Sequence, residues 1–368
     1  MCRIPFLSLT AVSVLLLPLI GTAYAEATIP TGEDPKDVAV NPKTNLVYVA
    51  NFDNVAVIDG ATNSVIHTIP IGSVNGWSIE VNPASNKAYV AGYLSNSVHV
   101  IDTNTNTVVS IIPVGRSPQG IAINSKTNTI YVASNGDVSS VAAIDGHTDT
   151  VIKKIDLQPN SKNNGLTAVW PSGIAIDEER NLVYVGGNAS GAIVAIDGST
   201  NEIIDRIPRD GDFRRMAVDP SDGTLYAANV AYGTVDIIRG HDIDPIRRFD
   251  GTALDYPQAI DINPKTGRIF VSDSNSVFVT GGIGPHVAKR IQVDGIPLGI
   301  AVNPETNMIY VANYVGDSIA VIDGKTESVV LTPWSVWPEI AAIGAVAVIA
   351  GIIILAKRNR FRKRPVLS

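Results

Sequence analysis

Residues 297–324 read PLGIAVNPETNMIYVANYVGDSIAVIDG and contain three short runs of β-branched, Ala and Tyr residues. A fourth run starts at Ser328. Clusters of Asn, Pro, Gly and Asp, which favour tight turns, separate the runs. Runs of this length and composition are typical of β-strands. The segment therefore predicts a four-stranded antiparallel sheet of about 40 residues.

The same pattern occurs seven times along the chain. Counted from the first residue of the innermost run, the units start at Pro35, Gly76, Pro118, Pro171, Phe213, Pro257 and Pro297, with spacings of 41, 42, 53, 42, 44 and 40 residues. So small a sheet cannot bury both faces alone, and closing seven units around an axis covers every large face. The sequence predicts an all-β fold, a seven-bladed β-propeller of four-stranded blades over residues 26–333. The alternatives are an open solenoid, or a six-bladed ring with one unit elsewhere.

The innermost run of each unit also favours a closed ring. Two large aliphatic residues flank a central position, as Val38 and Val40 flank Ala39. The central residue is Ala in five units and an acid in two, at Glu80 and Asp261. An acid at the crowded axis is costly unless it is paired. Glu80 and Asp261 are therefore predicted to bind a ligand in the channel, or to hydrogen-bond to channel water or backbone. They lie nearly across the ring, so we do not expect them to share one small ion.

Two segments are candidates for the outer strand of unit seven. Residues 328–332 follow the third run of that unit, and residues 29–32, Ile-Pro-Thr-Gly, match the end of an outer strand such as Ile-Pro-Val-Gly at 112–115. We expect both ends of the propeller to meet at this blade.

The second run of each unit carries a specific resemblance. It reads YVAN at 48–51, YVAG at 89–92, YVAS at 131–134, YVGG at 184–187, YAAN at 226–229, FVSD at 270–273 and YVAN at 310–313. An Ile-Asp-Gly or Ile-Asp-Thr turn follows at Asp59, Asp102, Asp145, Asp197 and Asp323. Over about residues 28–332 the chain resembles the YVTN-family β-propeller repeats. The resemblance implies a cell-surface propeller of a prokaryotic, often archaeal, surface-layer type, and no single reaction. Arg239 and Gly281 replace the Asp in units five and six, so their outer hairpins are predicted to be less regular.

Residues 1–25 are predicted to be a secretory signal peptide. Arg3 precedes an apolar stretch at 4–20, and Ala-Tyr-Ala ends at Ala25, so cleavage is expected between Ala25 and Glu26. A retained N-terminal membrane anchor is the alternative.

Residues 340–356, IAAIGAVAVIAGIIILA, are predicted to be a transmembrane helix after a stem at 334–339. Six basic residues follow within 357–368, which places the tail in the cytoplasm and the propeller outside the cell, on a single-pass protein of the cell membrane. A buried core helix is the alternative. Pro338-Glu339 before an apolar segment also resembles the C-terminal signals that exosortase-like enzymes process.

Composition narrows the possible functions. The chain has 368 residues, 45% hydrophobic and 17% charged, so it can bury a core. Residues 26–337 hold 21 basic and 34 acidic side chains, a net charge of −13, and an acidic body repels phosphate backbones. We expect no nucleic-acid partner. The single cysteine, Cys2, lies in the signal segment, so we expect no disulfide or Cys-based metal site.

Motifs of known chemistry are missing from the sequence. The five histidines are not spaced in the sequence as metal ligands are: His67, His99, His147, His241 and His286. The chain has no G-x-S-x-G elbow, phosphate loop or dinucleotide fingerprint. We therefore expect no catalytic residue, metal or cofactor. We expect a non-enzymatic binding or scaffold module whose partner is a cell-envelope protein or glycan. The alternative is a propeller enzyme, lactonase-like or quinoprotein-dehydrogenase-like, with a site at the channel mouth.

The residues just before each innermost strand are expected to surround one mouth of the channel. They are Lys36, Trp77, Gln119, Ser172, Arg214, Arg215, Gln258 and Leu298. Indole and guanidinium groups supply contact area and directed hydrogen bonds, so Trp77, Arg214, Arg215, Gln258 and Lys36 are predicted binding residues. The longer segment between units three and four, at 156–170, is the alternative binding element, or a tolerated surface insertion.

Overall fold

The computed structural model describes residues 28–136, 138–158, 170–188, 190–246, 254–281 and 289–330. The predicted signal peptide with its Ala25–Glu26 cleavage point, the stem, the transmembrane helix and the basic tail lie outside these ranges. Within these ranges, no helix has the length and hydropathy that a membrane span requires.

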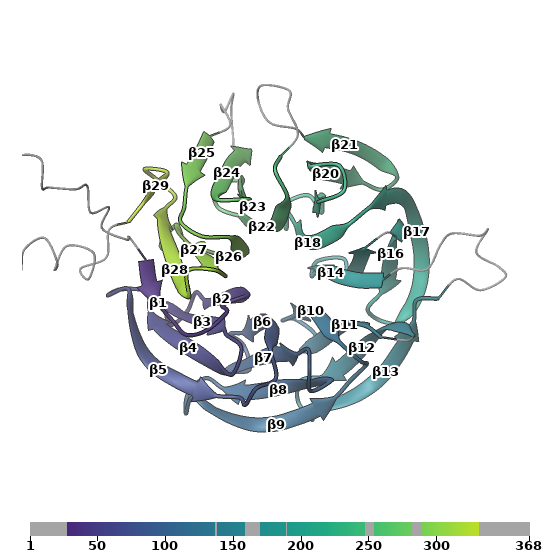
Figure 1. The fold of residues 1–368 in the computed structure, drawn as a ribbon. Helices are drawn as coiled ribbons and strands as arrows, with labels where there is room; N and C mark the ends of the chain where they lie inside the picture. Colours follow the sequence, from purple (N-terminus) through teal and green to yellow (C-terminus); the bar gives the residue numbers. More distant parts are fainter. Residues whose placement is uncertain are drawn as a thin grey trace, which may run out of the picture. The chain divides into compact units, whose positions relative to one another are not determined.

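The described chain forms a seven-bladed β-propeller (Figure 1). The innermost strands are β2 (Asp37–Asn41), β6 (Gly76–Asn82), β10 (Pro118–Asn124), β14 (Trp170–Asp177), β18 (Phe213–Val218), β22 (Pro257–Asn263) and β26 (Pro297–Asn303). Each of them contacts the next one, and β26 contacts β2, so the ring is closed. The seven-bladed prediction is confirmed, and the solenoid and six-bladed alternatives are wrong.

In blades one to six, three further strands follow the innermost strand in sequence order, and in blade seven its second and third strands do, all antiparallel. The second strands are β3 (Leu46–Ala50), β7 (Lys87–Gly92), β11 (Thr129–Asn135), β15 (Leu182–Asn188), β19 (Leu225–Asn229), β23 (Arg268–Asp273) and β27 (Met308–Asn313). The third strands are β4 (Asn54–Asp59), β8 (Ser97–Asp102), β12 (Ser139–Asp145), β16 (Ser190–Asp197), β20 (Thr234–Arg239), β24 (Ser276–Gly281) and β28 (Ser318–Asp323). The outer strands of blades one to six are β5 (Ser64–Pro70), β9 (Thr107–Pro113), β13 (Thr150–Asp156), β17 (Glu202–Gly211), β21 (Asp242–Ile246) and β25 (Lys289–Gln292).

Blade seven has an outer edge made of two strands. At one end of β28, β1 (Thr28–Pro30) pairs with residues 318–320. At the other end, β29 (Ser328–Val329) pairs with Ile322 and Asp323. The prediction that both ends of the propeller meet at this blade is confirmed. Pairing of β1 with β28 joins the first described strand of the chain to the last blade.

The hydrophobic core lies between the blades. Seven clusters of buried apolar side chains are found in the described ranges, and each cluster joins two neighbouring blades, including blades seven and one. The Tyr of the second run is fully buried in four blades, at Tyr48, Tyr89, Tyr131 and Tyr310. Because every blade needs a neighbour on both faces to bury these side chains, the repeat can only complete its core by closing.

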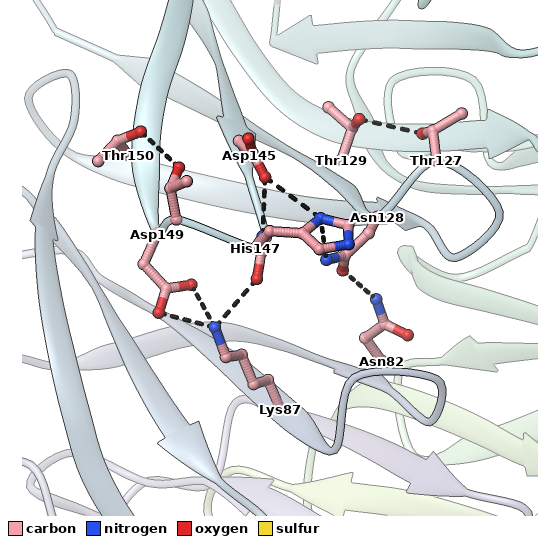
Figure 2. A network of polar contacts seen from close by, with 11 residues as sticks. Asn82, Lys87, Thr127, Asn128, Thr129, Asp145, His147, Asp149 and Thr150 are labelled. Atoms are coloured by element: carbon pink, nitrogen blue, oxygen red, sulfur yellow. Dashed lines mark hydrogen bonds and ion pairs between the residues drawn. The ribbon is translucent and has the colours of Figure 1, made fainter.

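Asn side chains link the blades on the face where the innermost strands end, which we call the turn face. Asn82 Nδ2 donates to Asn128 Oδ1 of the next blade at 2.7 Å, and Asn303 donates to Asn45 in the same way across the point of ring closure. Figure 2 shows this link between blades two and three, where Lys87 Nζ also lies 2.8 Å from both carboxylate oxygens of Asp149. These contacts account for Asn at the linked positions, and the positive φ of Asn45 and Asn128 favours the same residue type.

The outer hairpin of blade five differs from the prediction. In blade one, Asp59 accepts a hydrogen bond from Ala61 N at 2.9 Å, and the β4–β5 pairing shifts register between Val57 and Ile58. In blade five, Arg239 cannot accept this bond. The chain turns over Gly240, at φ +61°, and β20 and β21 pair without a register shift. The hairpin is therefore tighter, and the expectation of lower regularity is wrong for this blade. In blade six, residues 282–288 lie outside the described ranges.

Candidate functional site

The face where the innermost strands begin, the mouth face, contains a cavity of about 510 Å³. The structure brings all eight predicted mouth residues into its lining: Lys36, Trp77, Gln119, Ser172, Arg214, Arg215, Gln258 and Leu298. Sequence reasoning did not select the aromatic residues that complete the wall, which are Phe52, Tyr256 and Tyr314. Phe52 and Tyr314 both follow a YVAN run directly, and this shared position was a usable signal.

Lys36 lies among aromatic rings at the mouth. Its Nζ is 4.1 Å from the ring centroid of Tyr314 and 5.5 Å from that of Trp77. Trp77 in turn contacts Tyr93, with ring centroids 5.1 Å apart. Burial lowers the pKa of Lys36, and the carboxylate of Asp34 at 4.0 Å only partly opposes this shift. The rings therefore hold the ammonium in place at the cavity wall.

The two neighbouring arginines have different surroundings. Arg214 stays at the mouth, where its Nε donates to Asp212 Oδ2 at 3.0 Å. Arg215 extends from β18 in blade five across the channel, and its Nη2 lies 2.7 Å from Asp37 Oδ2 in blade one. Its Nη1 also donates to Ser78 Oγ in blade two at 3.2 Å. Arg215 thus ties together blades that are not neighbours in the ring (Figure 1).

Asp37 was not selected from the sequence. Its carboxylate also accepts hydrogen bonds from Ser78 Oγ at 2.9 Å and Ile79 N at 3.0 Å, so it is paired on several sides. A signal was present: Asp37 and Arg215 hold the same position of their innermost runs, where the other five units have Ser, Gly or Ala. One acid and one base at a position of small residues indicate a pair that meets across the axis.

A second cavity of about 470 Å³ occupies the channel beyond Arg215. Its lining includes Asp37, Glu80 and Asp261, so the two predicted channel acids do face the same space. Asp261 has a structural role, because its carboxylate accepts hydrogen bonds from Ile262 N and from Val302 N of blade seven, both at 2.8 Å.

The two acids are both harder to ionise than usual. The protein wall around the channel removes most bulk solvent from Glu80, and the carboxylates of Asp37 and Asp261 repel its charge, so its pKa rises to about 8. The Glu80 side chain nevertheless stays exposed to the channel. Desolvation likewise raises the pKa of Asp261 to about 6, although its two backbone hydrogen bonds oppose the shift.

The raised pKa of Glu80 predicts a pH-dependent stability. Between its usual value of 4.5 and about 8, the folded protein holds a proton that the unfolded chain releases. The free energy of unfolding should therefore fall as pH rises through this window. Glu80→Gln cannot ionise and should show a flatter profile, with its largest gain over the parent near the upper end. Channel water screens the charge, so the difference should be smaller than the full pKa shift would give.

Thermal unfolding of the parent and of Glu80→Gln at the two ends of this window checks the prediction. Asp261 titrates in both proteins, so the difference between the two profiles isolates Glu80. Parallel profiles would show that Glu80 ionises normally in the folded state.

The histidines do not form a site in the described residues, where no group of three or more His, Cys, Asp or Glu side chains could hold a metal ion. His99 is buried in blade two. His147 contacts Asp145, and His241 contacts Asp205 at 2.9 Å. His286 lies outside the described ranges.

Exposed apolar side chains are distributed unequally between the two faces. Among the described residues, the large exposed ones outside the outer strands are Leu94, Val138, Trp170, Tyr232, Tyr256, Ile296 and Val315. All seven lie in loops or at a strand start on the mouth face. The described turns of the turn face carry none. The mouth face is therefore suited to contact with a partner, because apolar side chains gathered on one surface favour binding.

The ring of small sheets and its repeated sequence define the class: the chain is a β-propeller repeat protein. A family model described as "Beta-propeller repeat" matches residues 164–193. Two relatives, each named "Uncharacterized protein YncE", from Salmonella typhi and Salmonella typhimurium strain LT2, are 25% identical over 221 residues, which is 58% of this chain and 62% of theirs. The YncE protein of Escherichia coli O157:H7 is 24% identical over 167 residues, 44% of this chain and 47% of its own. The chain thus matches less than two thirds of the length of these relatives.

One solved structure with a similar fold is the hydrazine synthase of Kuenenia stuttgartiensis. The superposition covers 79% of this chain and 96% of that chain, with a TM-score of 0.68 and 18% sequence identity. At this identity the likeness concerns the fold alone.

Proposed function

We propose that this protein is a non-enzymatic binding module of the prokaryotic, archaeal-type cell surface. In this proposal the propeller is of the YVTN type, is secreted by the signal peptide, stays attached to the cell membrane through residues 340–356, and captures a cell-envelope protein or glycan. The predicted signal peptide, the basic tail and the family resemblance support the location. The acidic body supports a partner other than nucleic acid.

The observation that carries the binding proposal is the difference between the two faces. The mouth face combines a cavity lined by Lys36, Trp77 and Arg214 with exposed apolar side chains in the surrounding loops. The turn face carries Asn links between blades and exposed ion pairs such as Lys126 with Glu179 and Lys265 with Glu305. Partners bind preferentially where aromatic and Arg side chains meet an apolar surface.

Site-specific photo-crosslinking on intact membranes tests this proposal. A photo-reactive amino acid at Leu298 in the cavity should link the full-length protein to an envelope component, whereas the same group at Lys126 on the turn face should not. The double variant Trp77→Ala/Arg214→Ala should reduce the Leu298 product about tenfold, because it removes an indole and a guanidinium from the cavity wall.

The matched control is Lys126→Ala/Lys265→Ala, which removes two exposed side chains from the turn face and should leave the product unchanged. Equal crosslinking from both faces, or an undiminished Leu298 product in the Trp77/Arg214 variant, would contradict the assignment of the mouth as the binding face.

A further inference from the structure

Lys36 has an ammonium group with no hydrogen-bond acceptor among the described residues. The residue is only 8% exposed, yet among the described residues no oxygen accepts a hydrogen bond from its Nζ. The carboxylate of Asp34 approaches only to 4.0 Å, and the rings of Trp77 and Tyr314 hold the ammonium by their faces. An ammonium carries three N–H donors and is costly to enclose without acceptors. These donors are therefore available to a molecule in the mouth cavity.

Gln258, like Lys36, is a buried residue with an open polar group at the cavity wall. It is 9% exposed and contributes to the cavity lining, and its side-chain amide has no hydrogen-bond partner among the described residues. Arg214 adds a third group, since Asp212 accepts from its Nε and no other hydrogen bond of this side chain is found among the described residues. Arg215 is different, because Asp37, Ser78 and the carbonyl of Trp77 already use its donors. The open groups of this cavity are thus two cationic donors, Lys36 and Arg214, and the neutral amide of Gln258, while Asp34 is the acid among its lining residues.

Such a set of groups is complementary to a carboxylate. A carboxylate accepts through two oxygens in one plane and can take bonds from an ammonium and from an amide together. Lys36 is buried beside the aromatic walls, and a charged hydrogen bond is stronger in such a site than in open solvent. Burial lowers the pKa of Lys36, and an anion in the cavity would oppose that shift.

The rest of the cavity favours a sugar over a peptide side chain. Gln119 and Asn75 add amide groups to the lining, and Phe52 and Tyr256 add ring surfaces. An Asp or Glu side chain of a partner protein would fill one corner and leave these groups unmatched. A sugar ring carries hydroxyl groups in several directions and an apolar C–H face. About 510 Å³ is also in the range of small-ligand sites.

We propose that the mouth cavity binds an acidic sugar residue of a glycan, with its carboxylate held by Lys36 Nζ and the Gln258 amide and its hydroxyl groups near Arg214 and Gln119. This inference rests on the proposed function, because it names the chemistry by which the mouth recognises a partner. Lys36 supplies the charge recognition, and Trp77 and Tyr314 position Lys36.

Calorimetry of the full-length protein in detergent micelles tests the inference with four probes: glucuronate, glucose, N-acetylglutamate and inorganic phosphate. Glucuronate should bind most tightly, and glucose, which has the same ring without the carboxylate, about tenfold more weakly. Lys36→Met keeps the aliphatic stem and removes the charge, so it should weaken glucuronate binding about tenfold without affecting glucose. Lys126→Met, on the turn face, is the matched control and should change neither affinity.

A second measurement uses the parent protein alone and does not depend on whether Lys36→Met folds. Acetylation of lysine side chains, followed by peptide mass spectrometry, should show that glucuronate protects Lys36 while leaving Lys126 as reactive as before. Glucose should protect neither residue.

Three results would overturn the inference: equal affinity for glucuronate and glucose, unchanged acetylation of Lys36 with glucuronate, or no binding of glucuronate at millimolar concentration. Tighter, Lys36-dependent binding of N-acetylglutamate would replace the sugar by an acidic peptide, and tighter binding of phosphate would replace it by a phosphate group. If the Leu298 crosslink depends on Trp77 and Arg214 while glucuronate fails to bind, this inference fails and the proposed function stands.

Discussion

Replacing Arg215 by Ala should lower the free energy of unfolding by about 3–5 kcal/mol, because the change leaves the buried carboxylate of Asp37 without its cation. Arg215 and Asp37 are 2.7 Å apart, with side chains 19% and 9% exposed. Asp37 would then share the channel with the acids Glu80 and Asp261, without the guanidinium that balances its charge. The ring should also lose the contact that joins blade five to blades one and two.

Urea unfolding followed by tryptophan fluorescence measures this effect. Arg214→Ala is the matched control, because that neighbouring side chain is more exposed and, within the described ranges, pairs only with Asp212 at the mouth. It should cost about 0–1 kcal/mol. The double variant Asp37→Asn/Arg215→Met removes both charges and should recover most of the lost stability. An Arg215→Ala protein as stable as the parent would show that the pair across the channel does not contribute to the fold.

The second large effect is expected at the strand that closes the ring. Ile29→Ala should cost about 2–5 kcal/mol, because Ile29 is 3% exposed and packs in the cluster that joins blade seven to blade one. β1 is only three residues long, and Ile29 is its one buried residue. Loss of this side chain should therefore open blade seven locally before the whole propeller unfolds.

Hydrogen exchange of the backbone amides at 318–320 reports this opening directly, since these residues pair with β1. Exchange there should rise in Ile29→Ala more than exchange in β10, on another side of the ring. Val65→Ala, on the outer strand of blade one where Val65 is 37% exposed, is the control and should stay within about 0.5 kcal/mol of the parent. Uniform exchange over all blades would contradict a local role for β1.

The sequence alone determined the architecture of this protein. Strands, turns and their order within each unit depend on about 40 consecutive residues, so the repeat from Pro35 to Pro297 was sufficient to predict seven blades and their innermost strands. Closure also followed from local information, because the segment at 29–32 matches the end of an outer strand and precedes the first unit. The mouth position of Lys36 and Gln258 followed from their place before an innermost strand. The outer hairpin of blade five was the exception, since Gly240 allowed a shorter turn than the missing Asp suggested.

Only the tertiary structure decided which side chains meet across the axis. Arg215 and Asp37 are far apart in the sequence. Their contact depends on the angles between successive blades around the closed ring. The same geometry brings Glu80 and Asp261 into one cavity and leaves Lys36 enclosed by rings from two other blades. Each of these contacts joins residues from different units. The sequence pattern within one unit gives no information about the distances between units. The sequence therefore predicted the scaffold and the rim of the site, and the folded ring decided the pairing of charges inside it.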